Sequence, residues 1–151
     1  MIMTNTETVM NTETIGMNTE KSREIVLAFA DRFARGNMAA ALALLADDAT
    51  WWVAGQPGHF ALAGQRGKAE LPALFQWIGT ALPAGVEVTI RGVTAEGGRV
   101  ALEVEARGVS AGGGNYCNQI HFLFEVRDGH IYSVREYLDT QHVQDVLVGD
   151  H

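Results

Sequence analysis

The chain has 151 residues, a length that fits one domain with a single hydrophobic core. Apolar residues make up 47% of it, and 11 Lys and Arg against 18 Asp and Glu leave a formal charge of −7 at pH 7. Such an acidic surface repels phosphate groups and anionic membranes, so we expect no binding to nucleic acid or membrane. The single cysteine, Cys117, cannot form an intramolecular disulfide, and we expect a cytoplasmic protein.

Polar blocks of similar sequence fill the N-terminus: Asn5-Thr6-Glu7-Thr8, Asn11-Thr12-Glu13-Thr14 and Asn18-Thr19-Glu20. Between them lie only scattered apolar residues, too few to offset the entropy lost when a chain becomes ordered. We therefore expect residues 1–17 to be a disordered tail and residues 18–148 to form one domain. The alternative is that the tail is an arm folding over a partner or a pocket mouth.

Helical periodicity dominates the next part of the chain. Asn18-Thr19 offers a cap for a first helix that carries an apolar stripe and ends at Gly36. Asn37 caps a short second helix, which Asp47-Asp48 closes. Its apolar face consists of Leu42, Leu45 and Ala46.

A short strand, residues 50–53, separates these two helices from a third. The third helix follows Gly67, tolerates Pro72 in its first turn and stops at Pro83. Its apolar side chains recur with the helical period: Leu71, Leu74, Phe75, Ile78 and Leu82.

From residue 85 the apolar period changes from 3.6 to 2, which predicts strands over residues 86–91, 100–107, 116–126 and 131–138. Helices followed by hairpin-linked strands are typical of an α+β fold. We expect no nucleotide cofactor, because the glycines at 112–114 join two strands instead of opening a helix. We also expect no metal: Asp139 and His142 lie three residues apart, and no third ligand accompanies them.

Three segments together resemble the SnoaL-like branch of the nuclear transport factor 2 superfamily, whose members include polyketide cyclases, limonene epoxide hydrolase and relatives of ketosteroid isomerase. They are residues 48–53 (Asp-Ala-Thr-Trp-Trp-Val), the strand opening Tyr116-x-Asn118, and Asp128-Gly129 running into residues 135–139 (Arg-Glu-Tyr-Leu-Asp). The resemblance implies a cone-shaped α+β fold, with three N-terminal helices packed on a curved, mostly antiparallel sheet around a pocket. It also implies a homodimer formed through the outer sheet face.

The resemblance assigns candidate residues to the pocket. Glu136 falls where limonene epoxide hydrolase has its catalytic pocket carboxylate, and Trp51 where that family has a tyrosine. Strand alternation puts further side chains on the pocket face. The candidate catalytic residues are Glu136, Tyr116 and Asn118. The candidate substrate-binding residues are Trp51, Val53, His59, Val104, Ile120, Phe122, Tyr132, Leu138 and His142.

Two departures from limonene epoxide hydrolase argue against epoxide hydrolysis. The positions of its Arg and second Asp hold Val104 and Ala106, and the position of its water-binding Asn holds Val53. A one-residue register slip would turn Glu103, Glu105 and Arg107 inward instead. The slip is disfavoured because it would expose the apolar residues of the same strand.

Each candidate has a purely structural alternative. A pocket-facing Glu136 would be poorly solvated, with a pKa raised into the range of a general acid or base, whereas an exposed Glu136 would pair with Arg135. Tyr116 and Asn118 either hold a substrate oxygen or bond to each other and the backbone. Trp51 and Trp52 point to opposite faces.

We therefore expect a cofactor-free enzyme that transfers protons on a small, apolar, oxygenated substrate: an isomerase, an aldol-type cyclase, a retro-aldol lyase or a dehydratase. The alternative is a non-catalytic module that binds small molecules or associates with a partner through the same fold.

Overall fold

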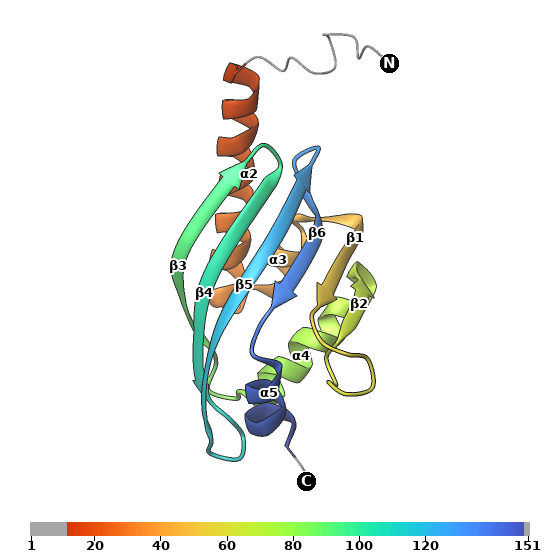
Figure 1. Ribbon diagram of the computed structural model, residues 1–151, viewed down its shortest axis with the longest axis vertical. Helices are drawn as coiled ribbons and strands as arrows, with labels where there is room; N and C mark the ends of the chain where they lie inside the picture. Colours follow the sequence, from red (N-terminus) through yellow and green to blue (C-terminus); the bar gives the residue numbers. More distant parts are fainter. Residues whose placement is uncertain (1–11, 150–151) are drawn as a thin grey trace.

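In a computed structural model that describes residues 12–149, helices lie against one face of a curved six-stranded sheet (Figure 1). The helices are α2 (Thr12–Ala34), α3 (Met38–Leu42), α4 (Leu71–Ala81) and α5 (Thr140–Val143), with a 3-10 turn at Lys68–Glu70 and a π-helical turn at Gln144–Val148. The strands are β1 (Leu45–Val53), β2 (Gly64–Gly67), β3 (Glu87–Glu96), β4 (Arg99–Val109), β5 (Asn115–Arg127) and β6 (His130–Tyr137). The expected α+β class is confirmed.

The strands follow the order β2-β1-β6-β5-β4-β3 across the sheet. All neighbouring pairs are antiparallel except β1 and β6, which are parallel. The four strands expected after residue 85 are therefore hairpin-linked neighbours. Strand β1 returns from the helical half of the chain to lie beside the last strand, so residues far apart in sequence meet at the centre of the sheet.

Helix α2 begins at Thr12, six residues before the expected cap at Asn18. The hydroxyl of Thr19 accepts a hydrogen bond from the Gly97 N–H (2.8 Å) in the β3–β4 turn, which ties the helix to the sheet. Of the tail expected over residues 1–17, residues 1–11 lie outside the described residues. From Thr12 onward the chain is helical.

The region between α3 and β1 also differs from expectation. Asn37 caps α3 as predicted, accepting a hydrogen bond from the Ala40 N–H (3.3 Å). The helix ends at Leu42, however, so Leu45 and Ala46 belong to β1 instead of the helical face. Leu45 is 1% exposed and pairs with Ile131 of β6. An apolar side chain buried on either kind of element looks the same in sequence.

Strand alternation sorts β4 and β5 onto two faces as predicted. Val100, Leu102 and Val104 are at most 3% exposed and face the helices. The register pairs Val104 with Ile120 of β5. The register slip that would have turned Glu103 inward is therefore excluded.

A β-bulge interrupts this alternation on β6. Glu125 pairs with Ser133 and Val126 with Ile131, so Tyr132 is the extra residue of β6 at this point. Ile131 and Val134, on either side of the bulge, are both fully buried.

No helix among residues 12–149 is long and apolar enough to cross a membrane.

Candidate active site

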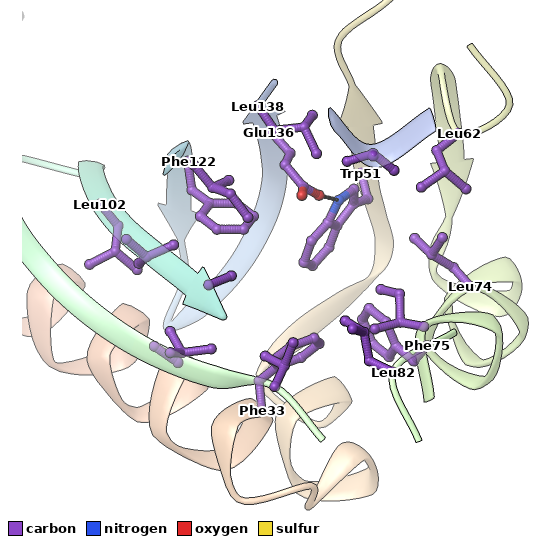
Figure 2. A pocket seen from close by; sticks show the side chains of 18 of the residues that line it. Phe33, Trp51, Leu62, Leu74, Phe75, Leu82, Leu102, Phe122, Glu136 and Leu138 are labelled. Carbon is purple, nitrogen blue, oxygen red and sulfur yellow. Dashed lines mark hydrogen bonds between the residues drawn. The ribbon is translucent and has the colours of Figure 1, made fainter. Parts of the chain in front are cut away.

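A cavity of about 120 Å³ lies between the inner sheet face and helices α2 and α4 (Figure 2). For comparison, an engineered apolar cavity of about 150 Å³ holds a benzene molecule. Among the described residues that line the cavity, Glu136 is the only one with a charged side chain, and the Tyr116 hydroxyl and two indole N–H groups are the other polar groups. The remaining wall is hydrocarbon. The cavity suits a small molecule that is mostly apolar.

Glu136 projects from β6 into this cavity, close to the indole of Trp51 (Figure 2). The Trp51 indole N–H donates a hydrogen bond to Oε1 of Glu136 (3.0 Å). Some of the Glu136 side chain remains accessible, but it lines the cavity, and apolar groups surround the carboxylate. This burial raises the pKa of Glu136 to about 7, although the Trp51 hydrogen bond and the charge of Arg66 lower it.

Tyr116 lines the same cavity from β5 and is 6% exposed. Burial raises the pKa of Tyr116 to about 12, against the lowering effect of the Asn118 side chain, and the negative charge of Glu136 adds to the rise. The phenol is therefore neutral across the physiological range. A neutral phenol is a hydrogen-bond donor for a ligand oxygen.

Asn118 does not line the cavity, contrary to the prediction from its place beside Tyr116. Its side chain is 1% exposed and is engaged by the backbone of Asp139. Nδ2 donates to the Asp139 carbonyl and Oδ1 accepts from the Asp139 N–H, both at 3.1 Å. The amide thus joins β5 to the start of α5, which is the structural alternative weighed for this residue.

Four expected substrate-binding residues lie outside the cavity lining. Val53 is buried in the core at 2% exposure, and His59 is exposed in the loop after β1. His142 stacks on the ring of Tyr116 at 5.4 Å, and its Nε2 accepts a hydrogen bond from a β5 backbone N–H. The bulge in β6 turns Tyr132 away, so that its hydroxyl donates to Glu125.

The other expected residues do come together at the cavity. They are Trp51, Val104, Ile120, Phe122 and Leu138, in addition to Glu136 and Tyr116. They come from β1, β4, β5, β6 and the chain just after β6. The family resemblance placed Glu136 and Trp51 in the pocket, and strand alternation placed the others that lie within a strand on the same face.

Sequence reasoning missed the parts of the wall that do not belong to the central sheet. Helix α2 contributes Phe29 and Phe33, helix α4 contributes Phe75, and the C-terminal segment contributes Val143 and Leu147. The apolar stripes of the helices were visible in sequence. Which stripe residues line a cavity depends on how the helices sit against the sheet, and a stripe does not encode that.

Arg66 is the second omission. It lies on β2 and pairs with Trp51 of β1, and its charge lowers the pKa of Glu136. Strand β2, residues 64–67, reads Gly-Gln-Arg-Gly and has no apolar alternation that would reveal a strand. No sequence signal pointed to Arg66.

The outer sheet face carries polar and aromatic side chains. Trp52 stacks under the guanidinium of Arg135 at 4.1 Å, and His121 contacts the ring of Tyr137. Trp51 and Trp52 thus point to opposite faces, as predicted. The homodimer expected through this face stays a prediction.

Among residues 12–149, no group of three or more His, Cys, Asp or Glu side chains is arranged to hold a metal ion.

The SnoaL-like domain family matches residues 26–134 of this sequence. The chain belongs to the SnoaL-like domain family. The matched range runs from within α2 to within β6 and so includes most of the sheet. The expected resemblance is thereby confirmed. A search of curated proteins found no match.

Solved structures support the same fold. An NTF2-like protein from Burkholderia xenovorans LB400 is 29% identical, with a TM-score of 0.70 over 85% of this chain and 97% of its own. TerC, co-crystallised with polyporic acid, is 20% identical, with a TM-score of 0.75 over 85% and 98%. An LEH-like epoxide hydrolase from M. tuberculosis is 23% identical, with a TM-score of 0.65 over 86% and 91%. Solved structures with this fold thus include an NTF2-like protein and an LEH-like epoxide hydrolase.

Proposed function

We propose that this protein is a cofactor-free enzyme that moves a proton on a neutral, mostly apolar substrate carrying a carbonyl or hydroxyl oxygen. The observation that carries the proposal is a single carboxylate, Glu136, on the wall of an otherwise apolar cavity. With a pKa of about 7, this group exchanges a proton readily near neutral pH. Isomerisation, aldol-type cyclisation, its reverse and dehydration all need such a step.

In the proposed reaction, the ionised Glu136 removes a proton from a carbon next to the substrate carbonyl. The electron pair of the broken C–H bond moves onto the carbonyl oxygen, where the Tyr116 hydroxyl donates a hydrogen bond. Glu136 then returns the proton to the same or another carbon. Because Tyr116 stays neutral, it stabilises the oxyanion without giving up its proton.

The composition of the cavity wall supports a neutral substrate. None of the lining residues in the described range 12–149 is an arginine, lysine or histidine, so a carboxylate or phosphate group would have no cationic partner among them. These lining residues also include no Arg–Asp pair. Val104 and Ala106 of β4 occupy the positions where limonene epoxide hydrolase has its Arg and second Asp. This difference favours proton transfer over epoxide hydrolysis.

The test begins with a ligand screen by thermal shift. Cyclic ketones, steroids, terpene epoxides, phenolic diols and polyporic acid, the ligand crystallised with TerC, are suitable probes. A ligand at about 100 times its Kd adds about 2.7 kcal/mol to the free energy of unfolding, which raises Tm by about 5–11 °C. A ketone found in this way is then incubated with the protein in D₂O. NMR measures deuterium uptake at the carbon next to its carbonyl.

We expect Glu136→Gln to slow this deuterium uptake at least about 100-fold while the protein stays folded, because the amide cannot take up the proton. The matched control is Glu105→Gln, which removes a carboxylate from the outer face of the same sheet. Its uptake should stay within about twofold of the wild type. Unchanged uptake in Glu136→Gln would refute the assignment.

A second candidate function is binding without chemistry. The engagement of Asn118 by the Asp139 backbone favours it, because among the described lining residues only Tyr116 and two indole N–H groups then accompany Glu136 for orienting a substrate. This alternative predicts ligands that raise Tm but show no deuterium uptake and no conversion with the wild-type protein.

A further inference from the structure

We propose that Trp51 is a positioning residue for Glu136: its indole N–H holds Oε1, so that proton transfer takes place at Oε2. The proposal deepens the proposed function, because it states how the same site controls its acid–base group. It depends on three observations: the hydrogen bond between the two side chains, the fixation of the Trp51 ring, and the apolar surroundings of the carboxylate.

The first observation is the hydrogen bond itself, at 3.0 Å from the indole nitrogen to Oε1. An indole N–H is a donor only, so it satisfies one carboxylate oxygen and never competes for the proton. Among residues 12–149, we find no other side chain that donates a hydrogen bond to Glu136. Oε2 is left to a ligand in the cavity that Glu136 lines (Figure 2).

The second observation is that aromatic rings from three elements fix the Trp51 ring. Its centroid lies 5.9 Å from Phe29 of α2, 5.7 Å from Phe75 of α4 and 6.1 Å from Phe122 of β5. Trp51 is 3% exposed. A ring packed on several sides keeps its N–H aimed in one direction, which is the condition for a preorganised catalytic group.

The third observation is that the carboxylate is desolvated. A hydrogen bond in an apolar setting favours the ionised form of its acceptor more strongly than the same bond in water. Trp51 therefore keeps part of the Glu136 population ionised near neutral pH, against the effect of burial. Without this bond, a larger share of the protein would carry the protonated acid and could not remove a proton.

The test is Trp51→Phe, which keeps an aromatic ring in the cluster but removes the N–H. The Cδ resonance of Glu136, recorded by NMR in ¹³C-glutamate-labelled protein and identified by its loss in Glu136→Gln, reports the titration directly. We expect the midpoint to rise by about one pH unit, the size expected for losing one hydrogen bond to a charged group. The pH profile of deuterium uptake should shift in the same direction. An unchanged midpoint would overturn the proposal.

The matched control is Trp52→Phe, on the next residue and the opposite face, where the ring contacts Arg135. It should leave the Glu136 midpoint within about 0.2 unit of the wild type. An equal rise in both variants would mean that a general loosening of β1 causes the shift, and would also overturn the proposal.

A measurement on the wild-type protein covers the case in which Trp51→Phe does not fold. The indole N–H resonances of the three tryptophans are assigned with Trp52→Phe and Trp77→Phe. The Trp51 resonance should titrate with the Glu136 midpoint and lose this step in Glu136→Gln. A Trp51 N–H chemical shift that does not change with the titration of Glu136 would contradict the proposal. Neither NMR titration needs turnover, so the two failures are distinguishable: absence of catalysis would refute the proposed function, on which this inference rests, whereas an unchanged Glu136 midpoint would refute the role of Trp51 alone.

Discussion

The pKa of a carboxylate is shifted in opposite directions on the two faces of the sheet. Glu136 on the inner face has a pKa raised to about 7, whereas hydrogen bonds from Gln119, Arg107 and Arg91 hold the pKa of Glu105 on the outer face down at about 2. Neither side chain is freely exposed, and Glu105 is only 7% accessible.

The chemical nature of the covering atoms explains the difference. Polar and cationic side chains cover Glu105: Gln119 donates at 3.0 Å, Arg91 at 2.9 Å, and Arg107 also donates to it. Hydrocarbon and the edge of one indole surround Glu136. The outer carboxylate is thus held ionised as part of a stable network. The inner one is kept near the point where it gains or loses a proton, which suits catalysis.

The largest expected effect concerns the hydroxyl groups on the two faces. Tyr116→Phe removes the donor that we assign to the substrate oxygen. Loss of one such donor typically costs 100-fold or more in turnover, about 2.7 kcal/mol. We therefore expect deuterium uptake by a ketone ligand to fall by about that factor. NMR measures the uptake, and circular dichroism shows whether the fold is retained.

Tyr132→Phe is the matched control for this prediction. Simple alternation would place Tyr132 in the cavity, but the bulge turns it outward to Glu125. Uptake by this variant should stay within about twofold of the wild type. A loss as large as that of Tyr116→Phe would contradict the assignment of the two hydroxyls to different faces.

The second prediction concerns the dependence of stability on pH. The pKa of Glu136 rises from 4.5 to about 7 on folding, so between these values the folded protein holds a proton that the unfolded chain releases. The wild type therefore loses stability as pH rises through this window, whereas Glu136→Gln does not. Relative to the wild type, the variant should gain on the order of 3 kcal/mol between pH 4.5 and 8. Urea denaturation at a series of pH values measures this difference.

Glu105→Gln should behave in the opposite way. The lowered pKa of Glu105 stabilises the fold above the unfolded value of 4.5, and this contribution is lost as pH falls toward about 2. The variant should be less stable than the wild type at pH 7, and the difference should shrink on acidification. Parallel pH curves for the two variants would refute the contrast between the faces.

The sequence predicts the sheet well because strand alternation is a local property. Strand alternation, together with the family resemblance, assigned Val104, Ile120 and Glu136 to the inner face, and the structure places all three on the cavity wall. Alternation fails where a bulge adds one residue, as at Tyr132. Nothing in the local sequence of β6 marks this bulge, because it reflects how β5 and β6 fit together.

The interaction partners of a side chain are harder to predict than the sheet face on which the side chain lies. Asn118 lies on the same inward-facing side of β5 as Ile120. Its amide, however, forms two hydrogen bonds with the backbone of Asp139, 21 residues further along the chain. Arg66 affects Glu136 from a strand with no recognisable pattern. Both features depend on contacts between distant segments, so periodicity and propensity carry no information about them.

The smallest predicted effect tests the structural role of Asn118. Asn118→Ala removes both hydrogen bonds to Asp139 and should lower the free energy of unfolding by about 2 kcal/mol, near 1 kcal/mol for each bond. Thermal denaturation should show a fall in Tm of about 4–8 °C. Because the segment after Asp139 carries Val143 and Leu147 of the cavity wall, ligand affinity should weaken as well.

The neighbouring residue on the outer face provides the matched control. Gln119→Ala removes one hydrogen bond to Glu105, which keeps its two arginine partners, and both of these arginines are more than half exposed. We expect a loss below about 1 kcal/mol and no change in ligand affinity, since a partner that stays hydrogen-bonded carries little penalty. Equal losses in the two variants would show that the Asn118 amide does not anchor the C-terminal segment, and Asn118 would again be a candidate for substrate binding.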